Sequence, residues 1–192
     1  MGVLAIYRDE WAKQAKETAF EDSEDLAELK AMGESLVTKY HEVAAPHIEP
    51  AAVELPVKGK ISGVNVRGFI DLLDIYGNVI DLKSANKTPS GIRDDYRFQV
   101  STYKLLEPRA TGVARIDTVV KLKREVKLVP QSFEVTPADE KQVETMYPLV
   151  QAAMKGGVYL PNRNTFLCAR KYCPFWRACE KEFGGIVKGG EE

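Results

Sequence analysis

Two acidic side chains and a lysine lie close together in the stretch GFIDLLDIYGNVIDLKS, residues 68–84. Asp71 and Asp81 are ten positions apart, and Lys83 follows Asp81 by two positions. Alternate side chains of a strand share a face, so Asp81 and Lys83 should point the same way. A turn centred on Gly77 would fold the preceding strand back and bring Asp71 roughly opposite both. The spacing therefore predicts a hairpin that aims two acids and a lysine at one place.

The neighbours of these three residues are apolar, which makes full exposure of the acids improbable. The flanking apolar positions are Ile70, Leu72, Leu73, Val79, Ile80 and Leu82. A cation should therefore sit between the carboxylates, and Mg²⁺ or Mn²⁺ is the natural candidate because hard cations select carboxylate and carbonyl oxygen. Such an ion can polarise a phosphoryl oxygen and lower the pKa of a bound water. Lys83 could orient the attacking hydroxide or neutralise charge on the phosphate.

The elements that must position this hairpin follow from the apolar periodicity. Spacings of three and four predict two helices within residues 3–44 and further helices at 93–106 and 136–155. Period-two patterns predict strands at 53–57, 64–75, 79–83, 116–123 and 126–135. Ser23 is a candidate N-cap for the second helix, and Thr136 with Pro137 is a helix-start signal. This order predicts an α/β core around a mixed sheet.

The bulk properties are those of one globular domain. The chain has 192 residues, of which 44% are hydrophobic and 29% are charged. It has no apolar run of about 18 residues and no signal peptide, so we expect no membrane span and no Sec export. The few cysteines fit a reducing cytoplasm. We expect a single domain over residues 1–182, with a helical part at 1–50, a catalytic core at 51–135, a helix and cysteine-rich tail at 136–182, and a flexible C-terminus at 183–192.

The charge is unevenly distributed although the net charge is only -1. Residues 1–54 hold twelve acids and five bases, whereas residues 83–131 hold eleven bases and five acids. A polyanion could be held by the second region and not by the first. Solvated faces of helices and strands are an equally simple reading of both regions.

Three motifs in order carry a resemblance to a known family. Asp71 followed by Asp81-Leu82-Lys83 resembles the D…(D/E)-x-K signature of the PD-(D/E)XK nuclease superfamily. Gln99-x-x-x-Tyr103 resembles the motif of its RecB-type branch. The C-terminal cysteines resemble the tail of iron–sulfur members, which include AddB-type and CRISPR-associated nucleases; they are Cys168, Cys173 and Cys179. The similarity covers roughly residues 50–182 and implies a restriction-endonuclease-like core, with a central mixed β-sheet flanked by helices and a cysteine-rich tail.

The resemblance also implies roles for single residues. Asp71 and Asp81 would be metal ligands, with the backbone carbonyl of Leu82 as a third ligand and Lys83 as the catalytic lysine. Glu54 resembles an auxiliary acid of this branch. Gln99 and Tyr103 share a helix face and would line the site and contact DNA.

Basic residues after the Asp81 strand are candidate phosphate contacts. They are Lys87, Arg93 and Arg97, and exposed charge without a ligand is at least as simple an explanation for each.

Two parts of the family pattern are absent. RecB-type members carry a metal-binding histidine on an early helix, and here we interpret both His41 and His47 as surface or packing residues. The first of four cluster thiolates is also absent, and from the resemblance we expect that one contiguous upstream element is lacking or that the chain is a short form. Three thiolates could hold a [4Fe–4S] cluster with an outside ligand, or Zn²⁺ with a histidine, or could simply be reduced cysteines.

The sequence thus favours a metal-dependent DNA nuclease, acting as an exonuclease on DNA ends or single strands. Related domains serve DNA repair and recombination and often work beside a helicase. A non-catalytic nucleic-acid-binding module with a degenerate nuclease fold is the first alternative, and a metal-stapled interaction domain is the second. The chain has no Walker-type phosphate loop, so we expect no ATP hydrolysis of its own.

Overall fold

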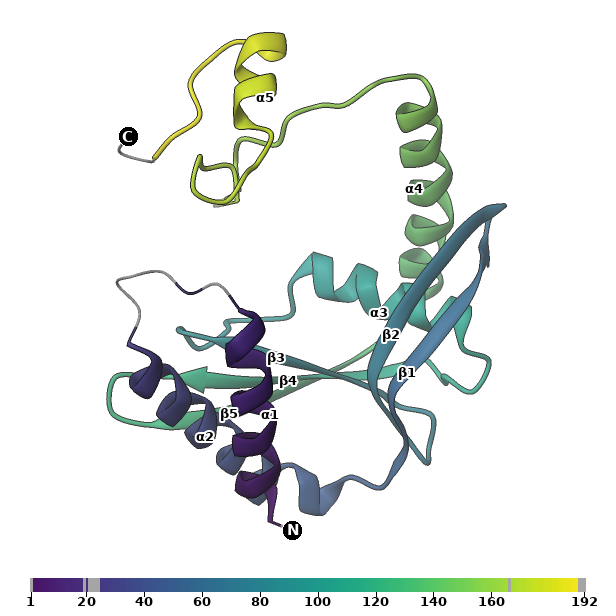
Figure 1. Cartoon of the computed structure of the whole chain (residues 1–192). Coiled ribbons are helices and arrows are strands. Elements are labelled where there is room, and N and C mark those ends of the chain that lie inside the picture. Colours follow the sequence, from purple (N-terminus) through teal and green to yellow (C-terminus); the bar gives the residue numbers. More distant parts are fainter. Residues whose placement is uncertain (1, 19, 21–24, 166, 190–192) are drawn as a thin grey trace. The chain divides into compact units, whose positions relative to one another are not determined.

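The chain forms two compact units. The computed structural model (Figure 1) describes residues 2–18, 20, 25–165 and 167–189, and it divides into Met1–Pro148 and Leu149–Glu192. Each unit is described by itself. The expectation of one domain over residues 1–182 stays a prediction.

A five-stranded mixed sheet forms the centre of the first unit. The strands are β1 (Pro50–Ile61), β2 (Val64–Asp74), β3 (Val79–Ala85), β4 (Val113–Lys121) and β5 (Val126–Glu134). Their spatial order is the chain order, and every neighbouring pair is antiparallel except β3 and β4, which are parallel. Parallel neighbours need a crossover connection, and the helix α3 (Asp94–Leu106) supplies it. The predicted α/β core around a mixed sheet is confirmed.

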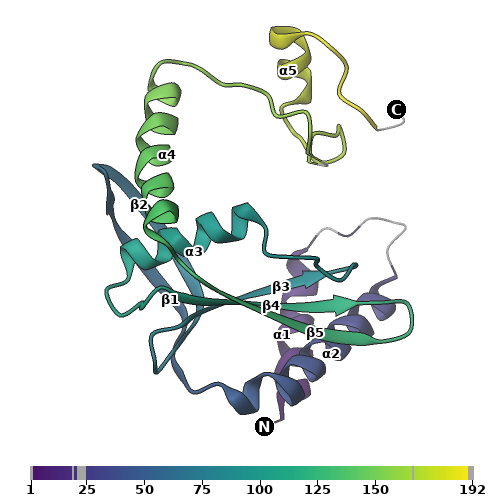
Figure 2. The ribbon, with the colours of Figure 1, turned by 180° about the vertical axis from the view of Figure 1, so that it is seen from behind.

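Helices cover the sheet on two sides. These helices are α1 (Val3–Glu17) and α2 (Leu26–Val43) on one side and α3 on the other. The chain also forms the short 3₁₀ helix η1 (Ala45–His47) and the helix α4 (Pro137–Lys155). The pair α1 and α2 lies side by side on one face of the sheet and α3 lies on the other, as Figures 1 and 2 show from opposite directions. The arrangement is that of a restriction-endonuclease-like fold. No helix in the described part of the chain combines the length and hydropathy needed to cross a bilayer.

Side-chain caps define where two of the helices begin. Asp25 accepts hydrogen bonds from the backbone N–H groups of Ala27 and Glu28 and so caps α2. The predicted cap Ser23 lies outside the described residues. At α4, Asp139 N–H donates to Thr136 Oγ1, and the Asp139 carboxylate accepts from the Thr136 backbone N–H. This reciprocal pair confirms the helix start predicted at Thr136.

The core lies between α3 and the sheet. It is built from β-branched and aliphatic residues of the strands together with two residues of α3, Val100 and Tyr103. Ile70 and Leu73 of β2 and Val79 of β3 are at most 1% exposed, which places both arms of the β2–β3 hairpin against this core. Burial of these side chains is the main force that holds the hairpin in place.

The turn between β2 and β3 is organised by Asp74. Its carboxylate accepts hydrogen bonds from the backbone N–H groups of Tyr76 and Asn78 and from the Asn78 side-chain amide, all at 2.8 to 2.9 Å. Gly77 has φ 79°, and a Cβ there would lie 2.3 Å from the Arg109 carbonyl oxygen. The predicted turn at residues 76–78 is confirmed, and these contacts set the register of the strands that follow.

The β1–β2 hairpin is longer than the sequence indicated. The strand predicted at residues 53–57 runs over Pro50–Ile61, and Ser62 and Gly63 form a two-residue turn with φ 46° and 85°. Positive φ at both positions is the signature of a type I′ hairpin turn. The polar and glycine residues between 58 and 63 hide the period-two pattern, which explains the missed length.

The second unit contains the cysteine-rich tail and the helix α5 (Trp176–Phe183). Arg170 stacks on the Trp176 ring at 4.4 Å and pairs with Glu180 at 3.4 Å. Glu180 also accepts the Val187 backbone N–H, at 2.6 Å. These contacts tie the two ends of the tail to α5.

Candidate active site

The β2–β3 hairpin brings the two predicted acids together. Leu72 pairs with Ile80 and Leu73 with Val79, so the same register continued by one residue sets Asp71 opposite Asp81. The Leu82 backbone N–H donates to Asp71 Oδ2 at 2.7 Å. The strand that carries Asp81 therefore also fixes the Asp71 carboxylate.

Asp81 is a buried carboxylate with an incomplete set of partners. It is 1% exposed, and Lys83 Nζ lies 2.5 Å from its Oδ2. Asp81 Oδ2 is thus ion-paired with Lys83, whereas Oδ1 has no hydrogen-bond partner among the described residues. Burial raises the pKa of the Asp81 carboxyl; Lys83 opposes this shift and Asp71 adds to it. An under-coordinated buried carboxylate is costly unless a further cation neutralises it.

The Lys83 ammonium is held by groups from α3. Gln99 Oε1 accepts from Lys83 Nζ at 3.4 Å, and the Tyr96 ring lies below the ammonium with its centroid 5.1 Å away. Gln99 Nε2 in turn donates to Tyr103 Oη at 2.8 Å. A chain of contacts thus runs from Asp81 through Lys83 and Gln99 to Tyr103.

Tyr96 is the member of this group that the sequence reasoning missed. It precedes Gln99 by three positions and Tyr103 by seven, so all three share one face of α3. That spacing was a usable signal. A cation–π contact adds attraction for Lys83 without a competing negative charge.

Tyr103 approaches the sheet closely because β2 carries a glycine beneath it. A Cβ at Gly68 would lie 3.0 Å from Tyr103 Cε1. Burial is the main cause that raises the pKa of Tyr103, with the Asp81 and Asp71 carboxylates adding to it. Tyr103 is therefore a neutral phenol. It connects α3 to the surroundings of Asp71 and Asp81.

Glu54 lies on β1 at the position that faces Asp71. Its neighbours pair as Val53 with Leu72 and Leu55 with Ile70. Its backbone φ is 49°, a left-handed conformation that is strained for a residue with a Cβ, and its side chain is exposed. In the described part of the chain, no three His, Cys, Asp or Glu side chains gather around a common point. The structure therefore brings Asp71 and Asp81 together and leaves Glu54 beside them.

The three predicted phosphate contacts have different surroundings. Lys87 is exposed in the loop after β3, and Arg93 makes a two-point contact with Asp95 at 2.8 and 2.9 Å. Arg97 pairs with Asp139 at 3.4 Å and stacks on the Phe133 ring at 4.6 Å. These contacts hold Arg97 between α3, β5 and α4, so its charge already has a partner.

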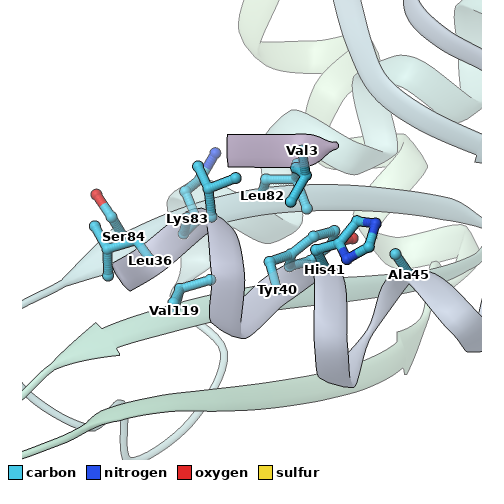
Figure 3. Close-up of a pocket in the computed structure, with 10 residues that line it drawn as sticks. Val3, Leu36, Tyr40, His41, Ala45, Leu82, Lys83, Ser84 and Val119 are labelled. Atoms are coloured by element: carbon cyan, nitrogen blue, oxygen red, sulfur yellow. The ribbon is translucent and has the colours of Figure 1, made fainter. Parts of the chain in front are cut away.

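A pocket of about 420 Å³ borders β3 on the side of α1 and α2 (Figure 3). Its lining is mostly aliphatic and includes Leu82 and Val3, with His41 at its rim. The Lys83 ammonium is held by Gln99 and Tyr96 of α3, so the pocket is better suited to apolar contact than to binding phosphate. Tyr40 of the same lining donates to the buried Asp117 at 3.2 Å, and burial raises the pKa of Tyr40.

The three cysteines line one hollow of about 340 Å³ within the second unit. All three are free thiols, and Arg163 Nη2 lies 3.6 Å from Cys179 Sγ. They do not form a three-donor metal group in the described residues. The cluster implied by the resemblance has no support from this geometry.

The comparison with protein families decides the affiliation of the chain. The family model of the PD-(D/E)XK nuclease superfamily matches residues 3–180. The chain belongs to the PD-(D/E)XK nuclease superfamily. The match includes the β2–β3 hairpin and α3, so the site described above lies within the PD-(D/E)XK region.

Solved structures give the same fold. A crystal structure of a "Putative exonuclease" from Eubacterium rectale aligns with a TM-score of 0.58 at 14% identity, covering 99% of this chain and 74% of that one. SSO0001 aligns with a TM-score of 0.48 at 13% identity, covering 93% and 96%. No curated protein matches the chain at a significant level. At 14% identity the first of these alignments shows a similar fold.

The donor set of this PD-(D/E)XK site fits a hard divalent cation. The Asp71 carboxylate is held beside the Asp81 strand by the Leu82 backbone N–H, and Oδ1 of the buried Asp81 has no hydrogen-bond partner among the described residues. Oxygen donors of this kind are what Mg²⁺ and Mn²⁺ prefer. Water and a backbone carbonyl such as that of Leu82 would supply further oxygen ligands.

Proposed function

We propose that the chain is a Mg²⁺- or Mn²⁺-dependent deoxyribonuclease that acts as an exonuclease on DNA ends or single strands. The observation that carries the proposal is the buried Asp81 carboxylate, whose Oδ2 is ion-paired with Lys83 and whose Oδ1 has no hydrogen-bond partner among the described residues. A structural ion pair at this depth would be expected to satisfy both oxygens. The open Oδ1 is suited to binding a divalent cation.

The proposed metal ligands are Asp71, Asp81 and the backbone carbonyl of Leu82, with Glu54 as an auxiliary acid. When bound, the cation would supply charge stabilisation at the phosphate and a water of lowered pKa. Asp71 is held toward β3 by the Leu82 backbone N–H, so one of its oxygens is already oriented. The strained backbone of Glu54 is a second sign of a functional position.

Lys83 is the proposed catalytic lysine. The Tyr96 ring and Gln99 Oε1 hold its ammonium beside Asp81. From there Nζ can donate to a non-bridging phosphate oxygen or orient the attacking water. A cationic ammonium at this place would stabilise the negative charge that grows on the phosphate oxygens during cleavage.

Gln99 and Tyr103 are proposed to position Lys83 and to contact DNA. Their mutual hydrogen bond and the contact of Gln99 with Lys83 support assignment to the RecB-type branch. Lys87, Arg93 and Arg97 remain proposed phosphate contacts, of which Lys87 has the most exposed position. A [4Fe–4S] cluster or Zn²⁺ on Cys168, Cys173 and Cys179, a helicase partner, a cytoplasmic location, and a role in DNA repair or recombination are expectations from the family resemblance alone.

The test is cleavage of end-labelled single- and double-stranded DNA in Mg²⁺, Mn²⁺ or EDTA. We expect metal-dependent shortening from the labelled or opposite end, lost in Asp81→Ala and in Lys83→Ala. Lys127→Ala is the matched control, because Lys127 is a half-exposed lysine on β5 that pairs with Glu125. It should leave the rate unchanged.

Two outcomes would contradict the proposal. DNA binding by the wild type without cleavage in any metal would indicate a non-catalytic binding module. Cleavage that survives both Asp81→Ala and Lys83→Ala would place the chemistry elsewhere or reveal a contaminating nuclease.

A further inference from the structure

The β1–β2 hairpin carries basic side chains and no acid over most of its length. Between residues 55 and 70 the charged residues are Lys58, Lys60 and Arg67. All three are exposed, and among the residues that the structure describes none of them has an ion-pair or side-chain hydrogen-bond partner. This segment therefore carries three positive charges that pair with no acid of the described residues.

The cross-strand register gathers these charges on one face. Lys58 pairs directly with Arg67, and Lys60 pairs with Asn65. Directly opposed residues of an antiparallel pair share a face, and so do alternate residues along each strand. The four side chains therefore form one polar face, and they border a hollow of about 550 Å³ at this end of the hairpin.

The opposite face of the hairpin belongs to the core. A Cβ at Gly59 would lie 3.0 Å from Leu106 Cδ2, and one at Gly68 would lie 3.0 Å from Tyr103 Cε1. Both glycines alternate with the basic positions, so α3 covers their face and leaves the basic face uncovered.

The placement of Lys58 opposite Arg67 destabilises the folded chain when no ligand is bound. Like charges that face each other across a strand pair destabilise a sheet. No acid lies on this hairpin segment to offset them. A polyanionic ligand would turn the same arrangement into a favourable one.

Phe69 adds an aromatic surface to the basic face. It pairs with Pro56 and follows Arg67 by two positions, so it shares the face of Arg67. Its side chain is 58% exposed, which is unusual for a phenylalanine in a strand beside a core. Basic residues interleaved with an exposed aromatic ring are the features of a surface for single-stranded nucleic acid, where phosphates pair with the charges and unpaired bases stack on the ring.

The position of this surface connects it to the proposed active site. Phe69 precedes Asp71 by two residues on β2, and Arg67 precedes it by four. At about 3.3 Å per residue, Arg67 and Asp71 are roughly 13 Å apart along the strand. The basic face therefore ends within a few residues of Asp71 along β2.

We propose that the β1–β2 hairpin is a binding track for single-stranded DNA, in which Lys58, Lys60 and Arg67 contact phosphates and Phe69 stacks on a base. The occupant is a single strand because a base inside a duplex is stacked between its neighbours and has no free face for Phe69. The claim that the bound DNA is a substrate rests on the proposed nuclease function. Binding of DNA to the hairpin can be measured without cleavage.

The first test is binding of fluorescent oligothymidylate in EDTA, measured by anisotropy over a range of salt concentrations. The triple variant Lys58→Gln/Lys60→Gln/Arg67→Gln should weaken binding at least about tenfold and reduce the slope of log affinity against log salt by roughly 2, because each lost phosphate contact removes about 0.7. Phe69→Ala should weaken binding about tenfold with the slope unchanged. The matched control is Lys123→Gln/Arg124→Gln/Lys127→Gln, which removes three charges from the β4–β5 hairpin.

The outcomes separate the track from the nuclease proposal. Wild-type affinity in the triple variant, or equal losses in the control, would overturn the track whatever the chain cleaves. Loss of binding in a triple variant that still melts cooperatively, as the wild type does, would support it. Hydrolysis of bis(p-nitrophenyl) phosphate with Mn²⁺ reports the acids and Lys83 alone, and it should be the same in the wild type and the triple variant.

Discussion

The Leu82 backbone N–H donates a hydrogen bond to Asp71 Oδ2 at 2.7 Å, so the strand that carries Asp81 also holds the other acid. The contact joins β2 to β3 just beyond the paired residues Leu72 and Ile80. It uses one carboxylate oxygen and leaves the second for another ligand. Asp71 therefore has two separable properties, an acceptor oxygen and a negative charge.

These two properties can be separated by substitution at Asp71. Asp71→Asn keeps an oxygen that can accept the Leu82 N–H, so we expect the free energy of unfolding to change by less than about 1 kcal/mol. Asp71→Ala loses the acceptor and should cost about 1 to 2 kcal/mol. Both variants should lose metal-dependent cleavage, because each lacks the charge. Urea unfolding and the cleavage assay measure the two effects, and full activity in Asp71→Asn would contradict the assignment of Asp71 as a metal ligand.

Asp81 predicts how stability and metal binding depend on pH. Burial raises the pKa of this carboxyl above its ordinary value of about 3.9. The stabilising contribution of its protonated form is therefore fully present below about pH 3.9 and is lost as the pH rises through the raised pKa. In EDTA at pH 7 to 8, Asp81→Asn should melt at a higher temperature than the wild type.

Metal should reverse that order, because only the ionised carboxylate binds a cation. Saturating Mn²⁺ should raise the melting temperature of the wild type and leave that of Asp81→Asn unchanged. At a concentration a hundred times the dissociation constant, the stabilisation would be about 2.7 kcal/mol. The effect should weaken as the pH falls through the raised pKa. An equal Mn²⁺ shift in both proteins would mean that Asp81 is not a ligand.

Substitution of Gln99 should lower the rate of cleavage without weakening metal binding. It accepts from Lys83 Nζ and donates to Tyr103 Oη, so Gln99→Ala frees the lysine without touching either acid. We expect kcat to fall by roughly 10- to 100-fold, the range seen when a supporting partner of a site residue is removed. The Mn²⁺-induced shift in melting temperature should stay at its wild-type size. A lost Mn²⁺ shift would instead mean that Gln99 supports the metal ligands.

Asp74 predicts a purely structural effect on the same hairpin. Its carboxylate accepts three hydrogen bonds in the β2–β3 turn, so Asp74→Ala should lower the free energy of unfolding by roughly 2 to 4 kcal/mol. Asp94→Ala is the control, since Asp94 is exposed in the first turn of α3. Chemical unfolding measures the difference. Equal stability of the two variants would show that the turn does not depend on its aspartate.

Local signals in the sequence determined much of this fold. Alternating residues predicted β3 with Asp81 and Lys83 on one face, and Tyr76-Gly77-Asn78 predicted the turn. Thr136 and Pro137 predicted the start of α4. Gln99 and Tyr103, four positions apart, were predicted to share a helix face. Each of these depends on neighbours within a few residues, where backbone geometry and side-chain chemistry act together.

Other features were decided only by the tertiary structure. The sequence allowed Asp71 to lie opposite either Asp81 or Lys83, and the Asp74 turn with the buried Leu73 selected the register with Asp81. Packing of α3 on the sheet placed Tyr96 below Lys83, a contact between residues thirteen positions apart. The burial of Asp81, and with it the direction of its pKa, also comes from that packing.

The length of the β1–β2 hairpin was also decided only by the tertiary structure. Its basic and glycine residues carry no apolar alternation, so no local pattern marks residues 58–63 as strand and turn. Pairing with β2 and the contacts of Gly59 and Gly68 with α3 order it. Cross-strand pairing and helix packing join residues that are distant in the chain, and their energies arise only once the whole sheet has formed.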